Sequence, residues 1–139
     1  MNHTKKIKWV VGSCIALVGI CSAVILYRTL RPERGLPYER ISMEQAAEYM
    51  EYEQGYALVD ARTREEYAEG HIPGAVCIPN EEIEELAPKL LPDCEQMIYV
   101  YCRSGKRSRQ AAAALCRMGY SNVTEIGGIR NWPGETEKE

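Results

Sequence analysis

The sequence predicts an α/β domain in which helices cover both faces of a central, mostly parallel sheet, preceded by one N-terminal transmembrane helix. Two observations predict the α/β domain. Short apolar runs of strand length alternate along the chain with segments of helical spacing, and Gly- and Pro-rich turns separate them. Such an alternation is typical of parallel strands joined by helices. A third observation, an uncharged run of nineteen residues near the N-terminus, predicts the membrane helix.

The expected elements follow one another from residue 38 to residue 126. They are an edge strand over 38–41, a helix from 43 to about 53, a strand over 56–60, a short helix to 69, a strand over 75–78, a helix to 91, a strand over 97–101, a helix over 106–118 and a last strand over 123–126.

Three side chains are expected to cap these helices. Ser42 is followed three positions later by Gln45, and Thr63 is followed at the same spacing by Glu66. Each pair matches the capping box that opens a helix. Asn80 is expected to cap the helix that ends at residue 91.

Proline and glycine mark the breaks in this pattern. Pro88 lies inside the predicted helix before residue 91, which it is expected to split or kink. Gly119 follows the helix over 106–118 and is expected to terminate it. The pair Gly127-Gly128 is expected to turn the chain back towards Trp132.

The N-terminal uncharged run extends from Trp9 to Tyr27. As a helix it would span roughly 28 Å, close to the hydrocarbon thickness of a bilayer, and aromatic residues suited to the membrane interface lie at both ends. We therefore divide this part of the chain into a basic tail (1–8), a single-pass transmembrane helix (9–27) and a linker (28–37). A cleaved signal peptide is less consistent with the length of the run. A lipoprotein signal at Cys14 is disfavoured because the run continues beyond it.

Three Lys or Arg residues flank each side of this run, so the charge bias that orients membrane proteins is weak. The N-terminal amine and Glu33 favour the N-terminus inside. We therefore expect a membrane protein whose domain lies outside the cytoplasm.

The charge of the chain divides unevenly. Residues 1–34 carry six Lys or Arg and one Glu, whereas residues 35–139 carry eleven Lys or Arg and nineteen Asp or Glu, a net charge of −8. An acidic domain is an unlikely nucleic-acid binder, so no nucleic-acid partner is expected. A cluster of cations in such a domain indicates a small anionic ligand.

That cluster surrounds Cys102. The apolar run over 97–101 leads into Cys-Arg-Ser-Gly-Lys-Arg-Ser and then into an alanine-rich helix. A cysteine placed before a helix N-terminus faces free backbone N–H groups and the positive end of the helix dipole, and both favour a thiolate. The four cations that add to this effect are Arg103, Lys106, Arg107 and Arg109.

Small residues at Ser104 and Gly105 let the loop backbone curl so that several N–H groups face inward, which makes an anion-binding nest. Asp60 and Cys102 each follow a predicted strand. Ligands of parallel sheets bind beyond the carboxyl ends of the strands, so we expect these two residues to face the same crevice.

The chain resembles the rhodanese domain at four places in the same order. These are Val59-Asp60-Ala61-Arg62, the stretch from Glu66 to Ala75, the Cys102 loop, and Gly127-Gly128 with Trp132. The resemblance implies a rhodanese-like three-layer fold over residues 38–135, followed by a charged C-terminal tail (136–139).

The resemblance also implies a sulfurtransferase. Cys102 would be the catalytic residue that takes a sulfane sulfur from thiosulfate or a similar anionic donor, forms a persulfide, and passes the sulfur to cyanide, a thiol or a thioredoxin-like protein dithiol. No cofactor is implied. The substrate-binding residues would be Arg103, Ser104, Gly105, Lys106, Arg107 and Ser108, with Asp60 and Arg62 as supporting charges.

Two other functions fit the same fold. Cysteine phosphatases that share it need an arginine six positions after the cysteine, and that position is Ser108 here. The loop is one residue shorter than theirs, which suits a persulfide better than a phosphoryl group. A non-enzymatic binding or regulatory module is the other alternative, although such modules usually lack the cysteine.

The remaining candidates are assigned structural roles. Cys77, Cys94 and Cys116 are expected to be unreactive. The chain has no Cys-x-x-Cys pair and its two histidines are isolated, so no metal site is expected. A disulfide framework is not expected either, because a domain of this size can build its own hydrophobic core. His71 is expected to bond the backbone in a turn, and Trp132 to pack near the edge of the sheet.

Overall fold

Five parallel strands form one sheet in the computed structural model, which describes residues 37–139. The spatial order is β1-β5-β4-β2-β3, so the last two strands of the chain lie in the middle of the sheet. This arrangement confirms the parallel sheet that the sequence predicts. The strands are β1 (Glu39–Arg40), β2 (Ala57–Asp60), β3 (Val76–Cys77), β4 (Ile98–Cys102) and β5 (Val123–Gly128).

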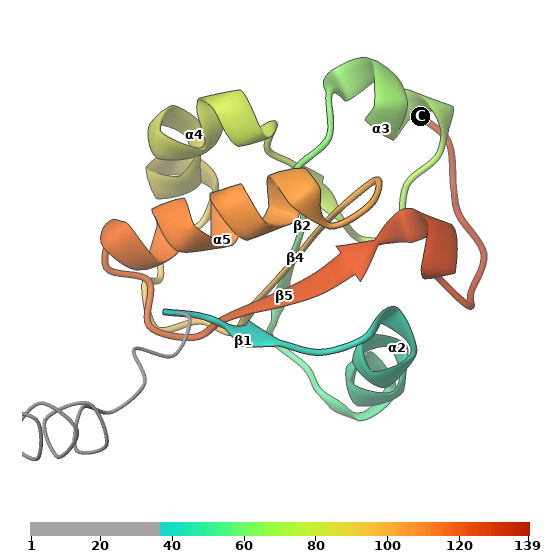
Figure 1. Cartoon of the computed structure of the whole chain (residues 1–139), viewed down its shortest axis with the longest axis horizontal. Coiled ribbons are helices and arrows are strands. Elements are labelled where there is room, and N and C mark those ends of the chain that lie inside the picture. Colours follow the sequence, from blue (N-terminus) through green and yellow to red (C-terminus); the bar gives the residue numbers. More distant parts are fainter. Residues whose placement is uncertain (1–36) are drawn as a thin grey trace, which may run out of the picture. The chain divides into compact units, whose positions relative to one another are not determined.

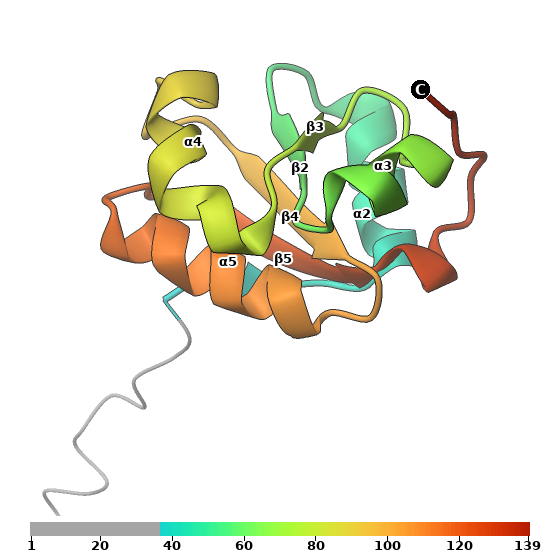
Figure 2. The ribbon, with the colours of Figure 1, turned by 90° about the horizontal axis from the view of Figure 1, so that it is seen from above.

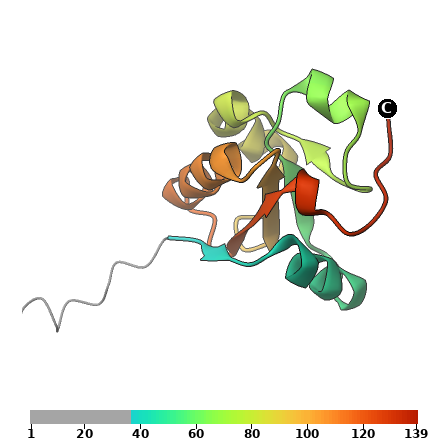
Figure 3. The same cartoon turned by 45° about the vertical axis from the view of Figure 1, so that its right-hand side comes forward.

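Helices cover both faces of this sheet. Figure 1 and Figure 3 show α4 and α5 together on one face and α2 on the other, which confirms the layered arrangement. The α-helices are α2 (Met43–Tyr52), α3 (Arg64–Glu69), α4 (Ile83–Leu90) and α5 (Lys106–Arg117), and the 3₁₀ turns are η1 (Asn80–Glu82) and η2 (Ile129–Asn131).

Strand β4 divides its side chains between the two faces. Ile98, Val100 and Cys102 belong to the apolar cluster under α4 and α5, whereas Tyr99 and Tyr101 belong to the cluster on the side of α2. All five residues of β4 are buried. This strict alternation follows from the two-residue period of a strand, and it points Cys102 towards α5.

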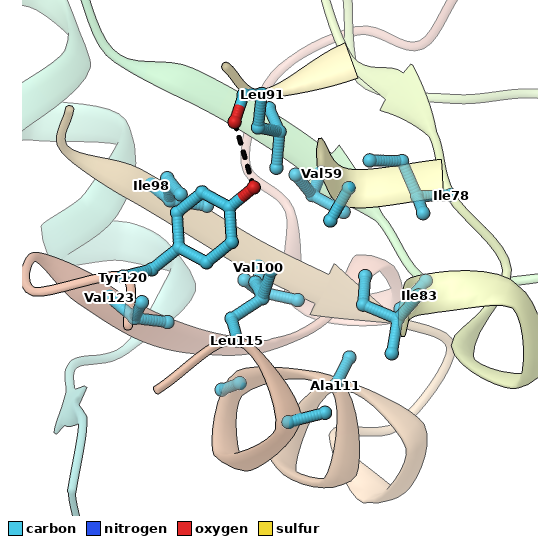
Figure 4. Packing of buried hydrophobic residues seen from close by; sticks show 14 of the residues in the cluster. Val59, Ile78, Ile83, Leu91, Ile98, Val100, Ala111, Leu115, Tyr120 and Val123 are labelled. Atoms are coloured by element: carbon cyan, nitrogen blue, oxygen red, sulfur yellow. Dashed lines mark hydrogen bonds between the residues drawn. The ribbon is translucent and has the colours of Figure 1, made fainter. Parts of the chain in front are cut away.

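The cluster between the sheet and the pair α4 and α5 is the larger one (Figure 4). Val59, Val100 and Leu115 lie at its centre and are fully buried. The hydroxyl of Tyr120 donates to the carbonyl oxygen of Leu91 at 2.8 Å, so the one polar side-chain atom of Tyr120 is satisfied within the apolar layer. This packing fixes α5 against β4 and thereby fixes the loop between them.

Both predicted capping boxes are present. The hydroxyl of Ser42 accepts the N–H of Gln45, and the side chain of Gln45 accepts the N–H of Ser42. Thr63 and Glu66 exchange the same two bonds at the start of α3. Gly119, with φ +99°, follows α5 as expected.

The predicted cap at Asn80 is wrong. Asn80 begins the 3₁₀ turn η1, and the N-cap of α4 is Glu82, which makes no side-chain capping bond. The amide of Asn80 donates instead to Gln110 on α5 at 3.3 Å. The helix is also not split at Pro88, because α4 continues through it to Leu90.

Two strand boundaries differ from the prediction, and both differences place residues of the site. Cys102 is the last residue of β4 and not the first residue of the loop, and β5 continues through Gly127-Gly128. Val100 pairs with Glu125 and Cys102 pairs with Gly128, so three residues of β5 span the length of two on β4. This bulge, with Gly127 at φ +91°, bends β5 beside the Cys102 loop.

The predicted basic tail, transmembrane helix and most of the linker lie outside the described residues. Within residues 37–139, no helix is both long and apolar enough to cross a membrane. At the other end of the chain, Glu137 and His71 exchange two backbone hydrogen bonds of 2.9 Å. Part of the predicted C-terminal tail is therefore attached to the domain.

Candidate active site

Cys102 ends β4 at the carboxyl edge of the sheet, and only three residues separate it from the first residue of α5. Figure 2 shows β4 leading through this short loop into α5. Gly105 is the N-cap of α5 and adopts φ +92°, the left-handed conformation that favours glycine. The loop therefore turns back tightly and brings the N-terminus of α5 over the thiol.

Hydrogen-bond donors converge on the sulfur of Cys102. The N–H of Gly105 donates to Cys102 Sγ at 3.1 Å. Burial by itself would raise the pKa of Cys102, whose exposed fraction is 1%. The N–H and hydroxyl of Ser108 and the N–H groups of Ser104 and Gly105 outweigh this effect, and the pKa of Cys102 lies below its ordinary value. The loop thus stabilises a thiolate.

The loop rests on the backbone of Gly128. A Cβ atom at Gly128 would lie 2.5 Å from the carbonyl oxygen of Arg103 and 2.7 Å from the Cα of Ser104. No side chain fits in that space, because such contacts are far inside van der Waals distance. The Gly127-Gly128 pair, predicted as a turn, therefore lets β5 approach the Cys102 loop.

A buried carboxylate lies beneath the loop. The hydroxyl of Ser108 donates to Glu125 Oε1 at 2.6 Å, and both residues are almost completely buried. The N–H of Gly127 donates to the same oxygen at 3.0 Å, and Arg40 Nε donates to the other carboxylate oxygen at 3.0 Å. Arg40 is the salt-bridge partner that makes a buried charge at Glu125 tolerable.

The cations of the loop fall into two groups. Arg107 is engaged by Glu66 of α3 in a bidentate pair with bonds of 2.6 and 2.9 Å. This hydrogen bonding to Arg107 lowers the pKa of Glu66 to about 2. Arg103, Lys106 and Arg109 are exposed, and no salt bridge is formed by their side chains among the described residues.

Asp60 and Arg62 form a separate buried pair. Arg62 donates to both oxygens of Asp60, with its shortest bond at 2.6 Å, and also to the carbonyl oxygen of Gly70 at 2.7 Å. The exposed fractions of Asp60 and Arg62 are 0% and 6%. Their charges are satisfied by each other, so they support the carboxyl end of β2 and the turn at Gly70.

The other described cysteines lack the donors that surround Cys102. Burial and the carboxylate of Asp60 raise the pKa of Cys77 to about 11. Burial raises the pKa of Cys116, and Cys94 is exposed. His71 donates from Nδ1 to the carbonyl oxygen of Tyr67 at 2.9 Å. This bond matches the turn role expected of His71.

Two residues contribute to the site that the sequence patterns do not predict there. Glu125 is one, and its signal is a single carboxylate within the otherwise apolar or β-branched run from Val123 to Ile126. Glu66 is the other. It forms the predicted capping box, but it also binds Arg107, forty-one residues away. No local pattern indicates that contact.

Fold and loop together define a class: an α/β protein whose stabilised thiolate lies in an anion-binding loop at the carboxyl edge of a parallel sheet. The model of the rhodanese-like domain family matches residues 42–135 of the chain. The chain therefore belongs to the rhodanese-like family, as the sequence motifs imply.

Relatives of this chain include two named thiosulfate sulfurtransferases. GlpE of Pseudomonas entomophila (strain L48) is 38% identical over 104 residues, which cover 71% of this chain and 92% of GlpE. PspE of Escherichia coli (strain K12) is 37% identical over 73 residues, which cover 52% of this chain and 70% of PspE. These similarities support a rhodanese-type sulfurtransferase. YrkF of Bacillus subtilis (strain 168) is 38% identical, and the match spans about half of its length, 52%.

Solved structures show the same fold. The rhodanese-like domain of the Anabaena sp. protein Alr3790, solved by NMR in solution, matches with a TM-score of 0.66 and 30% identity over 74% of this chain and 80% of that one. A rhodanese with anions from E. coli matches with a TM-score of 0.58 and 33% identity over 60% of this chain and 99% of that one.

Proposed function

We propose that this protein is a sulfurtransferase that moves a sulfane sulfur from thiosulfate, or a similar anionic donor, through a persulfide on Cys102 to a thiophilic acceptor. The observation that carries the proposal is the convergence of loop N–H groups on Cys102 Sγ, which stabilises a thiolate in a buried site. Its relation to named thiosulfate sulfurtransferases supports the same chemistry.

The first half-reaction balances without a base or cofactor. The Cys102 thiolate attacks the outer sulfur of thiosulfate, an S–S bond forms, and the S–S bond of thiosulfate breaks. Sulfite leaves with the electron pair of that bond. The enzyme keeps one negative charge, now on the terminal sulfur of the persulfide, where inward-facing loop N–H groups are suited to hold it.

The exposed cations explain how an acidic domain attracts a dianionic donor. Arg103, Lys106 and Arg109 are exposed around the loop, so they are free to steer the donor and to stabilise the departing sulfite. Arg107, predicted to share this role, is already paired with Glu66. We assign it the task of holding the start of α5 against α3.

In the second half-reaction an acceptor attacks the terminal sulfur and the Cys102 thiolate leaves. Cyanide would give thiocyanate. A thiol would give a new persulfide, and a protein dithiol of the thioredoxin type would go on to release sulfide as its own disulfide forms. All three need only an exposed outer sulfur, so the geometry of the loop is compatible with each.

We further propose that residues 9–27 anchor the protein in a membrane and that the domain lies outside the cytoplasm. The length of the uncharged run and its aromatic ends support the anchor. Cys94 is exposed, so labelling it with an impermeant maleimide in intact cells tests the side. Labelling only after lysis would overturn the orientation.

The decisive experiment incubates the purified full-length chain with thiosulfate and measures its intact mass. The expected result is a gain of one sulfur atom that cyanide removes as thiocyanate. The Cys102→Ser variant should show no gain, and Cys116→Ser should behave like the wild type. A wild-type thiolate that takes up no sulfur would instead favour a binding or regulatory module. Release of phosphate from a small aryl phosphate, abolished in Cys102→Ser, would favour a phosphatase.

A further inference from the structure

We propose that Glu125 is a positioning residue which, through the hydroxyl of Ser108, favours the persulfide form of Cys102 over its free thiolate. This inference rests on the proposed sulfur transfer. The Glu125 carboxylate contacts neither the sulfur nor the donor. It shifts the equilibrium between the free thiolate and the persulfide of Cys102.

Glu125 is a buried carboxylate whose position is fixed by hydrogen bonds. Its exposed fraction is 1%, and it accepts three hydrogen bonds, from Ser108 Oγ, Gly127 N and Arg40 Nε. Arg40 lies on β1 and is half-exposed, so the charge of Glu125 is partly compensated from the side away from the loop. The side facing the loop has only neutral donors.

Ser108 connects this carboxylate to the sulfur. Its hydroxyl lies 2.6 Å from Glu125 Oε1 and is also one of the donors that lower the pKa of Cys102. A hydroxyl carries a single proton, so it can be donated fully to Glu125 or to the sulfur but not to both. The two anions therefore compete for the proton of Ser108.

That competition ends when the persulfide forms. The negative charge moves from Sγ to the outer sulfur, and the inner sulfur becomes neutral and a weak acceptor. Ser108 can then donate to Glu125 without loss. The free thiolate, in contrast, either lacks the hydrogen bond from the Ser108 hydroxyl or receives it only when Glu125 loses it. Glu125 therefore penalises the thiolate relative to the persulfide, and likewise relative to the protonated thiol.

Other charges near the pair come from α5. Arg109 Nη1 and Glu125 Oε1 each lie 3.4 Å from the position that a Cβ atom at Gly105 would occupy. Arg107 also interacts with the charge of Cys102. The charge of Arg107 favours the thiolate, so the penalty imposed by Glu125 opposes it and reduces the stabilisation of the free thiolate without abolishing it.

The test replaces Glu125 with glutamine in the full-length chain. Ser108 and Gly127 donate to the same oxygen, Oε1. A neutral amide oxygen there accepts from Ser108 more weakly than a carboxylate does, which leaves the Ser108 proton more available to the sulfur. We expect the pH midpoint of thiolate absorbance, after subtraction of the Cys102→Ser background, to fall by roughly half a unit or more. At a fixed ratio of thiosulfate to sulfite, the equilibrium ratio of persulfide to free enzyme should fall roughly threefold or more, by intact mass.

Two controls separate this role from a general loss of charge or of structure. Glu53→Gln removes a carboxylate that accepts the Tyr99 hydroxyl at the C-cap of α2, and it should leave both readouts unchanged. Glu125→Asp keeps the charge for Arg40 but withdraws it from Ser108. It should shift both readouts in the same direction by less, and it serves if the glutamine variant does not fold.

The route through Ser108 is tested by a double variant. In a Ser108→Ala background, Glu125→Gln should change the thiol pKa by less than half of its effect in the wild type. An equal effect in both backgrounds would overturn the role of Ser108, and an unchanged or higher thiol pKa in folded Glu125→Gln would overturn the proposal. The thiol titration does not depend on sulfur uptake, so a failure of the proposed function is recognised separately.

Discussion

Cys77 and Cys102 each end a strand at the carboxyl edge of the sheet, yet the pKa values of their thiols are shifted in opposite directions. Cys77 ends β3 and Cys102 ends β4, and β2 lies between these strands. Burial and the nearby carboxylate of Asp60 raise the pKa of Cys77 to about 11. The pKa of Cys102 is lowered, although Cys102 is the more deeply buried of the two.

The difference lies in the segment after each strand. After Cys102 the chain turns within three residues into α5, so backbone N–H groups and the hydroxyl of Ser108 point at the sulfur. After Cys77 the chain continues into the 3₁₀ turn η1, and the thiol contacts the carbonyl oxygen of Arg62, which can only accept. A position at the carboxyl edge is therefore insufficient, and the donors of a helix N-terminus make the thiolate.

The sharpest way to test this comparison is to alkylate the wild-type chain with limiting iodoacetamide at pH 7 and map the modified peptides. Cys102 should react roughly 30-fold faster than Cys77 or more, because the pKa of Cys102 is lowered and that of Cys77 is raised, so a larger fraction of Cys102 is thiolate. Exposure predicts the opposite order, since Cys77 is the more accessible residue. Faster modification of Cys77 would show that access and not pKa governs these thiols.

The loop that creates the difference can be displaced by one methyl group. In Gly128→Ala the new Cβ would meet the backbone of Arg103, and we expect sulfur transfer to fall roughly tenfold or more. The free energy of unfolding should fall by about 2 kcal/mol. Steady-state thiocyanate formation and urea denaturation provide the measurements.

Gly119→Ala is the matched control for that variant. Gly119 has φ +99° but open space around its Cα. It should therefore cost about 1 kcal/mol of backbone strain with sulfur transfer unchanged. Equal activities of the two variants would show that the contact between Gly128 and the loop is unimportant.

The cations around the Cys102 loop should differ from one another in their effect on donor binding. Lys106→Gln should raise the KM for thiosulfate roughly three- to fivefold at low ionic strength, because this exposed ammonium is free to attract the donor. Arg107→Gln should change that KM less, since its guanidinium is paired with Glu66. A larger change for Arg107 would place it in contact with the donor.

The smallest effect concerns acid stability. Pairing with Arg107 lowers the pKa of Glu66 to about 2 from the ordinary 4.5. A depressed carboxyl pKa stabilises the fold above its unfolded value, and that stability is lost as the pH falls from 4.5 through 2. The contribution should be about 1 kcal/mol. Urea unfolding of Glu66→Gln between pH 7 and pH 3 should show a correspondingly weaker pH dependence.

Local patterns were sufficient for most of the fold. The capping boxes at Ser42 and Thr63 depend on residues three positions apart, and both are formed. Asn80 shows where this reasoning fails. Its side chain donates to Gln110 of α5, thirty residues further along the chain, because η1 packs against α5. Strand ends were also misplaced, because the bulge at Gly127 depends on pairing with β4.

The sequence by itself determined the parallel α/β arrangement, the position of Cys102 before a helix N-terminus and the cationic loop, because each depends on residues close together in the chain. Only the tertiary structure decided that Arg107 is bound by Glu66 and that Ser108 shares its proton with Glu125. The physical reason is distance along the chain. These partners are separated by 41 and 17 residues, and only the packing of α3, α5 and β5 around the loop brings them within hydrogen-bonding reach.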